Sequence, residues 1–376
     1  MKDRLAKEIL ARTMKWDALT LEKELSILQM MSDLKYDGYQ QFINGKQFIE
    51  SLALWLERFE EKDRQLVYTF VKEQIIYVSE QEMQQLAGAA FEELIKREIL
   101  KRARKCTKQP LVSLYGKKEI YQYYQRKTLF LGLSDGAHMD YFRRHNSFLT
   151  NEQVFMHYDF SEKKYEGMIE DLQKSILQSY PDLDISEERF ESFVLIDDFS
   201  GSGISYIRKE HTEDGDVWKG KIYKFVKSIL SREDDNSDIS IHIILYIATE
   251  NAVKNIKENL LAYLNEIGRE LVFTVGAVQY VKSVELGEEL ESVLKRDYDA
   301  HNNDGYESFI DEHFRKGNID RPYLGFNGCC LPLVLYHNTP NNSISAIWYG
   351  WNKKSAERLA RRDEALFPRI TRHKEN

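Results

Sequence analysis

The stretch at residues 193–205 limits the fold of this chain most strongly. It reads Phe-Val-Leu-Ile-Asp-Asp-Phe-Ser-Gly-Ser-Gly-Ile-Ser, an apolar run followed by two carboxylates and a short loop of Gly and Ser. The apolar run predicts a buried strand. The loop lets backbone N–H groups converge on an anion, and a helix that we expect after it adds the positive end of its dipole. The stretch therefore predicts a phosphate site where a buried strand ends.

The side chains of this stretch supply the other groups that a sugar phosphate needs. The hydroxyls of Ser200, Ser202 and Ser205 can donate to phosphate oxygens. Asp197 and Asp198, at the end of the strand, can accept hydrogen bonds from two vicinal hydroxyls. A phosphorylated pentose satisfies both halves of the motif at once. The alternative is a structural junction between strand, turn and helix with incidental acidic residues.

The stretch resembles the motif that binds phosphoribosyl pyrophosphate (PRPP) in type I phosphoribosyltransferases: an apolar strand, two acidic residues and a loop Thr-Gly-Gly-Thr. Asp197 and Asp198 match the acidic pair, and Ser202, Gly203 and Ser205 match Thr, Gly and the final Thr. Ile204 departs from the pattern, because the family usually has Gly or Ser there. The resemblance implies that the two aspartates are the catalytic residues and hold the ribose. It also implies a phosphate site at Ser200, Gly201, Ser202, Gly203, Ile204 and Ser205.

A second candidate site follows a short apolar strand that begins at Thr128, where Ser-Asp-Gly leads into a helix with paired arginines. In type I phosphoribosyltransferases the corresponding early loop contacts pyrophosphate. The resemblance implies that Asp135 holds Mg²⁺ through water. It implies a pyrophosphate site at Ser134, Asp135, Gly136, Arg143 and Arg144. The alternative is that Asp135 caps a helix and that the arginines are ordinary surface residues.

Strands and helices alternate through the central part of the chain. Apolar, β-branched runs predict strands at residues 239–248 and 271–280. Helical spacing predicts helices at 161–179 and 251–267, and a mostly helical segment at 206–229 with a polar interruption at 211–217. This alternation is typical of an α/β fold with a parallel sheet and helices on both faces. Ligands of such sheets bind at the carboxyl ends of the strands. We therefore expect the two candidate turns to share one crevice.

The flanking regions are predicted from pattern and composition. Residues 1–108 read as a helical domain, compatible with a winged-helix module and equally with a helical bundle. A capping box at Ser79 and Glu82 predicts a helix that begins at residue 80. We place a linker at 109–127, a phosphoribosyltransferase-like domain at 128–351 and a basic helical tail at 352–376.

The segment at residues 325–351 carries groups that can recognise a base. Amide side chains of Asn338 and Asn341 can bond to a base edge, and the ring of Trp348 can stack on a base. In type I phosphoribosyltransferases a variable hood covers the active site and selects the base, and the resemblance implies this role for residues 325–351. The alternative is an antiparallel edge hairpin with a structural Asn-Thr-Pro turn.

Composition and charge limit the class of protein, its location in the cell and its partners. The chain has 376 residues, 42% hydrophobic and 30% charged, which is typical of a globular protein of about two domains. It has no apolar run that could cross a membrane, no signal-like N-terminus and three cysteines, so we expect a cytoplasmic protein without a membrane partner. The net charge of −8 argues against a general nucleic-acid binder. Two basic runs, at 96–108 and 353–374, are either solvated helix faces or contacts with RNA, DNA or an acidic partner.

Most of the chain resembles the winged-helix plus phosphoribosyltransferase-like proteins of bacterial conflict systems, some of which are encoded beside a retron reverse transcriptase. The resemblance is carried by the helical segments 47–59 and 75–91, the Leu-Ser-Asp-Gly turn and the acidic-pair motif. It implies an anti-phage effector that binds PRPP or a nucleotide with Mg²⁺ and acts at the anomeric carbon. A reverse transcriptase and its nucleic acid are the implied partners. The alternative is a non-catalytic regulatory component that senses a nucleotide or binds nucleic acid or protein, and an oligomer is compatible with either function.

Overall fold

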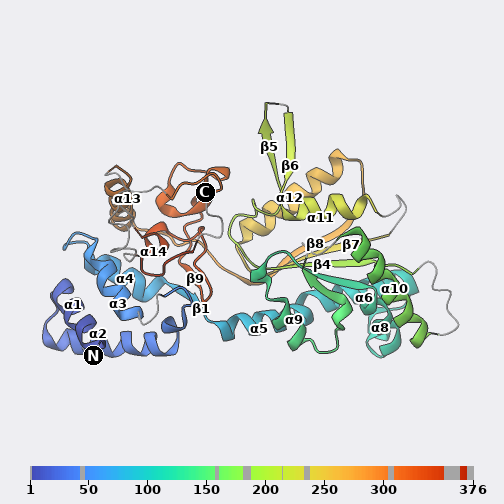
Figure 1. Ribbon diagram of the computed structural model, residues 1–376, viewed down its shortest axis with the longest axis horizontal. Coiled ribbons are helices and arrows are strands. Elements are labelled where there is room, and N and C mark those ends of the chain that lie inside the picture. The colour runs from blue at the N-terminus through green and yellow to red at the C-terminus, as the bar shows by residue number, and fades with distance from the viewer. Residues whose placement is uncertain are drawn as a thin grey trace. The chain divides into compact units, whose positions relative to one another are not determined.

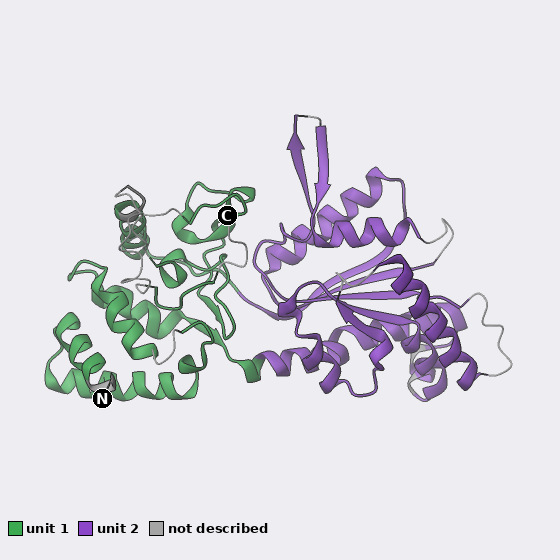
Figure 2. Cartoon of the chain, in the orientation of Figure 1, with its two compact units in different colours: residues 1–82, 282–376 green, residues 83–281 purple. Residues whose placement is uncertain are grey.

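The computed structural model describes residues 2–42, 47–156, 161–180, 188–213, 215–232, 238–303, 309–350 and 365–370. The chain forms two compact units: unit 1 contains residues 1–82 and 282–376, and unit 2 contains residues 83–281 (Figure 2). Both ends of the chain therefore build one unit. This grouping corrects the boundaries predicted at residues 108 and 127, neither of which separates the units. Among the described residues, no helix has both the length and the hydropathy to cross a membrane.

Unit 1 joins helices from both ends of the chain to a two-stranded sheet (Figure 1). Strand β1 (Ile76–Val78) pairs in parallel with β9 (Leu333–Leu335). The helices of the first segment are α1 (Lys2–Met14), α2 (Ala18–Leu34), α3 (Phe48–Glu57) and α4 (Arg64–Gln74). The second segment contributes α13 (Glu288–Asn303) and α14 (Ser345–Trp348). Single 3-10 turns lie at Tyr36–Gly38, Phe314–Lys316, Pro322–Leu324 and Phe326–Gly328.

The C-terminal segment contributes to the core of unit 1. Phe367 is fully buried, and its ring contacts the rings of Tyr36, Tyr39, Phe48 and Tyr77. Residues 365–370 are not helical, which corrects the predicted helical tail for this part. The rest of the predicted tail, 352–364 and 371–376, lies outside the described residues. The predicted hood at 325–351 belongs to unit 1, and Trp351 also lies outside the described residues.

Unit 2 contains a five-stranded sheet, and the prediction of an α/β fold with a parallel sheet is confirmed. The strands are β2 (Thr128–Gly132), β3 (Val154–Met156), β4 (Ser192–Ser200), β7 (Ser240–Ala248) and β8 (Val272–Tyr280). They lie in the order β3-β2-β4-β7-β8, and every neighbouring pair is parallel. The central strands β4 and β7 are buried along almost their whole length, which explains their continuous apolar sequence.

Helices cover both faces of this sheet. Apolar side chains of α10 (Glu162–Ser179), α11 (Lys221–Leu230) and α12 (Glu250–Glu266) form one core with the strands. Figure 1 shows α11 and α12 on one side of the sheet and α5 (Glu80–Ala90), α6 (Lys96–Thr107) and α9 (Met139–His145) on the other. Single turns lie at Asp135–Ala137 and Asn151–Gln153. The predicted capping box is confirmed, since the Ser79 N–H donates to Glu82 Oε2 (2.7 Å) and the Glu82 N–H to Ser79 Oγ (3.3 Å).

Two predicted segments differ in the structure. The predicted linker at 109–127 contains helices α7 (Leu111–Tyr115) and α8 (Lys118–Arg126), because Leu114 is buried against Leu100 and Ala103 of α6. The predicted helix at 206–229 begins instead with an antiparallel hairpin, β5 (Arg208–Thr212) and β6 (Gly215–Lys219), and only then continues as α11. Because only Trp218 of the hairpin strands is buried, its sequence has no clear apolar alternation.

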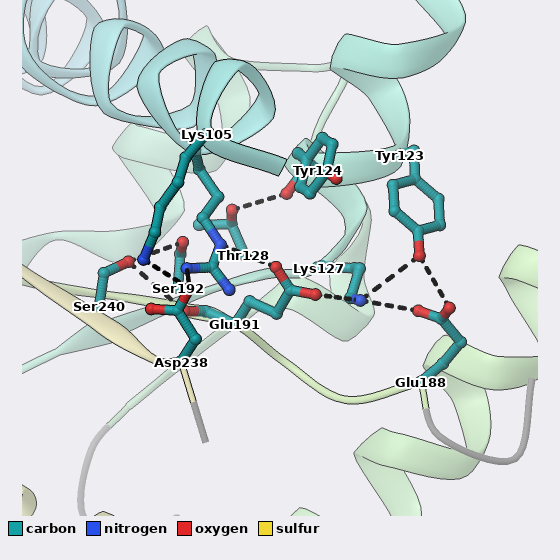
Figure 3. Close-up of polar contacts among 11 residues, drawn as sticks. Lys105, Tyr123, Tyr124, Lys127, Thr128, Glu188, Glu191, Ser192, Asp238 and Ser240 are labelled. Atoms are coloured by element: carbon teal, nitrogen blue, oxygen red, sulfur yellow. Dashed lines mark hydrogen bonds and ion pairs between the residues drawn. The ribbon is translucent and has the colours of Figure 1, made fainter. Parts of the chain in front are cut away.

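A polar network lies where the strands of the sheet begin (Figure 3). Lys127 Nζ lies 2.8 Å from Glu188 Oε2 and also pairs with Glu191. Tyr123 donates to Glu188 Oε1 at 2.7 Å. Arg102 of α6 bridges Glu191 (2.8 Å) and Asp238 (2.9 Å). The network therefore ties α6 and α8 to the amino edge of the sheet.

Acid should weaken the fold through His242 in β7. This side chain is buried, and burial lowers its pKa from the ordinary 6.5 to about 4. The unfolded chain takes up a proton near pH 6.5 that the folded chain does not accept until about pH 4, so stability falls as the pH falls through this window. We expect a loss of about 2 kcal/mol between pH 7 and pH 5, measured by urea unfolding. A His242→Gln variant should lose this part of the pH dependence, and an unchanged slope would contradict the assignment.

Candidate functional site

The two candidate turns lie at the carboxyl ends of neighbouring strands. Strands β2 and β4 pair in register from Thr128 and Ser192 to Gly132 and Ile196, and the turns follow directly. Strand β3 lies on the other side of β2, so the chain order reverses between β2 and β4. Such a reversal opens a crevice at the carboxyl edge of a parallel sheet, where ligands bind. The predicted meeting of the two turns is therefore confirmed.

A close contact joins these turns. A Cβ atom built on Gly136 would lie 2.4 Å from Asp198 Oδ2. Only glycine therefore lets the Ser134-Asp135-Gly136 turn lie against the carboxylate of Asp198. Ser134 Oγ in turn donates to Asp197 Oδ1. Both aspartates thus contact the turn that follows β2.

The two aspartates have different surroundings. Asp197 is 1% exposed, and its Oδ2 accepts hydrogen bonds from Tyr206 Oη and Lys221 Nζ, both at 2.9 Å. Burial raises the pKa of Asp197, while the Lys221 ammonium group opposes this shift. Asp198 is half-buried at the mouth of the strand. Asp197 therefore holds neighbouring side chains of the site in position from inside the protein. Asp198 presents the carboxylate that is more accessible to a ligand.

The carbonyl oxygens of the loop after β4 are occupied by hydrogen bonds within the protein. Each carbonyl from residue 201 to residue 206 accepts a hydrogen bond from the protein. The donors are Thr249 Oγ1 to Gly201 (2.7 Å), Asn255 Nδ2 to Ser202 (2.9 Å), Tyr206 N to Gly203 (3.1 Å), Arg208 Nη1 to Ile204 (3.3 Å), Lys221 N to Ser205 (3.3 Å) and Ile222 N to Tyr206 (2.9 Å). The beginnings of α11 and α12, together with Arg208 of β5, thus hold the loop in place.

The N–H groups of the same loop have fewer partners. The Gly203 N–H donates to Ser200 Oγ (3.1 Å), and the Ile204 N–H donates to Ser202 Oγ (3.4 Å). The N–H groups of Ser202 and Ser205 have no acceptor among the residues that the structure describes. A loop with occupied carbonyls and open N–H groups attracts an anion. The predicted phosphate loop has this property even though a hairpin, and not a helix, follows it.

Gly203 is required by the loop for two reasons. Its φ angle is +78°, and a Cβ atom there would lie 2.8 Å from the carbonyl oxygen of Ala252. Gly203→Ala should therefore destabilise unit 2 by about 2 kcal/mol, measured by urea unfolding. Gly167→Ala in α10 is the matched control, because its Cβ would meet nothing within 4 Å. The control should be neutral or stabilise the helix by up to about 1 kcal/mol, and equal losses in both variants would contradict this role of Gly203.

The sequence did not reveal two groups of the site. Lys221 is the first residue of α11, and its partly exposed ammonium group lies 2.9 Å from Asp197 and 5.4 Å from the ring centre of Tyr206. Lys221 reaches the site because the hairpin returns the chain to the loop, whereas Tyr206 comes before the hairpin and is part of the loop itself. Because Lys221 lies far beyond the motif in the sequence, no local pattern identifies it as a residue of the site. Gly220 lies just after the hairpin, and a Cβ atom built on it would lie 2.3 Å from the carbonyl oxygen of Tyr206. Glycine therefore lets the end of the hairpin lie against the loop.

The other predicted ligands are placed less directly. Asp135 is exposed in the turn beside Gly136. Arg143 and Arg144 lie in the last turn of α9, and no hydrogen bond or ion pair described for the chain joins them to Asp197 or Asp198. Their pyrophosphate role stays a prediction.

The predicted base-binding residues have partners within unit 1. Asn338 accepts from the Ile370 N–H (3.1 Å) and donates to the Ile370 carbonyl (3.0 Å). Trp348 is buried and donates to the Ser343 carbonyl (2.8 Å). The backbone carbonyl of Asn341 accepts from the Phe326 N–H (2.6 Å). The side-chain contacts give Asn338 and Trp348 a structural role, while the contact of Asn341 uses only its backbone. The base-binding role of all three residues stays a prediction.

The acidic groups fit a magnesium ion that is shared with a substrate. Within the described ranges, no group of three or more His, Cys, Asp or Glu side chains is arranged to hold a metal ion. Mg²⁺ commonly takes one or two carboxylates and completes its shell with water and substrate phosphates. Asp198 and Asp135 supply carboxylates of this kind on the two turns.

Comparison with known proteins identifies a family. A model of the PRTase-CE family matches residues 52–369, which include both turns, the whole sheet and Lys221. No curated protein and no solved structure matches the chain. The match covers most of the chain and agrees with the parallel sheet and the loop after β4. The chain therefore belongs to the PRTase-CE family, and it contains a phosphoribosyltransferase-like domain.

Proposed function

We propose that unit 2 binds PRPP or a related phosphorylated ribose at the carboxyl ends of β2 and β4. The observation that carries this proposal is the loop at 201–206, whose carbonyls are all occupied, while the N–H groups of Ser202 and Ser205 have no acceptor within the described ranges. Those N–H groups and the hydroxyls of the loop hold the 5′-phosphate. Asp198 accepts hydrogen bonds from the ribose hydroxyls, and Asp197 positions Ser134, Tyr206 and Lys221 around it.

The proposed chemistry occurs at the anomeric carbon. The bond from C1 to the pyrophosphate oxygen breaks, the electron pair leaves with pyrophosphate, and the sugar gains oxocarbenium character. A nitrogen of a nucleobase, or water when no base is present, then forms the new bond to C1 and gives up its proton to the solvent. Bound Mg²⁺ would neutralise charge on the pyrophosphate, with Asp198 and Asp135 as its protein ligands. Lys221 supplies a positive charge beside the loop. Catalysis then comes mainly from positioning and from stabilisation of the leaving group.

A turnover assay distinguishes the two hypotheses, an enzyme and a non-catalytic protein that senses a ligand. Release of pyrophosphate from PRPP with Mg²⁺ is measured with and without added nucleobases. Release by the wild type that is lost in Lys221→Met, with the fold retained by circular dichroism, supports an enzyme. Binding of PRPP without release supports the non-catalytic nucleotide sensor. Neither binding nor release rejects the phosphoribosyl site.

We further propose that the protein acts in an anti-phage system of the retron type, with a winged-helix-like N-terminal region, a reverse transcriptase and its nucleic acid as partner. One surface of α6 favours a nucleic-acid partner. Arg97, Lys101 and Arg104 are exposed and recur at helical spacing, so they share one face of α6, and the exposed Lys108 directly follows the helix. Arg97, Arg104 and Lys108 make no ion pair among the described residues, although the whole chain carries a net charge of −8.

If these basic residues of α6 bind nucleic acid, the affinity should fall as the salt concentration rises. Arg97→Glu with Arg104→Glu should weaken binding of a single-stranded oligonucleotide and lower the slope of log K against log salt by about 0.7 for each lost phosphate contact. Fluorescence anisotropy at several salt concentrations measures both quantities. The matched control reverses two exposed lysines of α10, Lys163 and Lys174. Equal losses in both variants would reject a specific role of the α6 face.

A further inference from the structure

The two edges of the sheet in unit 2 differ strongly. The edge strand β3 has three residues, whereas the opposite edge strand β8 has nine. The sequence of β8, Val-Phe-Thr-Val-Gly-Ala-Val-Gln-Tyr, contains no charged residue and no proline. Natural sheets usually protect an edge by shortness, charge or proline, because an open edge pairs with other chains. Only the β3 edge is protected by shortness.

The outer edge of β8 is open within the part of the chain that the structure describes. Strand β8 pairs only with β7, and no hydrogen bond described for residues 272–280 uses the backbone on the other side. Its faces are covered: Val275 and Ala277 lie in the core with α12, and Gly276 lies against Leu94. Yet Val272 and Tyr280 at its two ends are 55% and 47% exposed. The strand is therefore anchored by its faces and presents unpaired backbone groups along its edge.

We propose that β8 pairs in antiparallel fashion with β8 of a second copy of this chain, around a two-fold axis at Gly276. Gly276 is the central residue of the strand, so the pairing is symmetric. It sets Val272 opposite Tyr280 of the second copy, and Thr274 opposite Val278 of the second copy. Pairs of an aromatic and a β-branched side chain stabilise antiparallel strands. The exposed Val272 of each copy thus packs against the exposed Tyr280 of the other copy.

Charges beyond the strand favour the same register. Glu270 precedes β8 and Lys282 follows it, both are exposed, and neither has an ion pair within the described ranges. The Val281 N–H still bonds to the Ala248 carbonyl (2.9 Å), so the chain continues along the sheet past Tyr280. The two-fold axis at Gly276 places Glu270 opposite Lys282 of the second copy, at both ends of the interface. A second copy therefore complements this edge in length, side chains and charge.

The mass of the full chain in solution tests this interface. Sedimentation velocity should give about twice the chain mass of 44.4 kDa for the wild type. Val272→Lys should shift the protein to monomer, because it sets a lysine opposite Tyr280. Val217→Lys is the matched control, because Val217 is also exposed (41%) but lies on the hairpin strand β6. This control should remain a dimer.

A side-chain exchange makes the test specific to this register. Tyr280→Glu alone should also give monomer, whereas Val272→Lys combined with Tyr280→Glu should restore the dimer through two lysine–glutamate pairs. Circular dichroism confirms that each variant is folded. A wild-type monomer, a dimer that survives Val272→Lys, or a double variant that stays monomeric would each overturn the proposal. The interface does not depend on the chemistry proposed for the crevice, and PRPP binding to a monomer would separate the two.

Discussion

Replacing Lys127 with methionine is expected to lower the free energy of unfolding of unit 2 by about 3–5 kcal/mol. Its ammonium group pairs with Glu188 and Glu191, and the side chains of Lys127 and Glu188 are only 7% and 10% exposed. Methionine keeps the length of the side chain but removes its charge. Two carboxylates are then left close together with little access to water, which costs far more than an exposed ion pair contributes.

Urea unfolding of the full chain measures this loss, and Lys174→Met is its control. Lys174 lies on α10, is 69% exposed and lies 3.8 Å or more from its carboxylate partners. Removing its charge should change the stability by no more than about 0.5 kcal/mol. Similar losses in the two variants would show that the network at the amino edge of the sheet does not stabilise unit 2 in the way described.

Replacing Asp198 with asparagine is expected to weaken PRPP binding by about 100-fold. Asparagine has nearly the same shape, so it fits against Gly136, but it has no negative charge and only one acceptor oxygen. Hydrogen bonds to charged groups contribute about 1.5–3 kcal/mol each, and two ribose hydroxyls are involved. A loss of about 3 kcal/mol corresponds to two orders of magnitude in the dissociation constant.

Equilibrium dialysis with labelled PRPP and Mg²⁺ measures this change. Asp171→Asn, an exposed position on α10, is the matched control and should bind as the wild type does. An unchanged dissociation constant for Asp198→Asn would remove this carboxylate from the proposed ribose site. The variant should unfold at the same urea concentration as the wild type, because Asp198 is only half-buried.

The central strands β4 and β7 could be predicted from the sequence because they are buried on both faces, whereas the short, half-buried edge strand β3 was not predicted. Continuous apolar runs lead into Asp197 and fill β7, and the carboxyl ends of parallel strands must meet at one edge. The contact between Gly136 and Asp198 follows from that rule. Short-range signals such as the capping box of Ser79 were also sufficient, since their partners lie three residues away.

Features that depend on distant partners could not be predicted in this way. The pairing of β1 with β9 joins segments from the two ends of the chain, and nothing in either short run specifies the other. Phe367 reads as part of a basic tail, yet it is the aromatic centre of unit 1. Lys221 reaches Asp197 only because an exposed hairpin turns the chain back, and that hairpin buries too little to leave an apolar pattern.

Calorimetric titration of PRPP with Mg²⁺ into the wild type shows whether the carboxyl ends of β2 and β4, beside Asp198, form a phosphoribosyl site. Parallel titrations use Asp198→Asn and the double variant Asp197→Asn, Asp198→Asn. We expect saturable binding to the wild type at one site per chain, binding weakened by about 100-fold in the single variant, and no measurable heat in the double variant. A wild type that does not bind PRPP, or a double variant that binds it unchanged, would rule out a phosphoribosyl site at these aspartates.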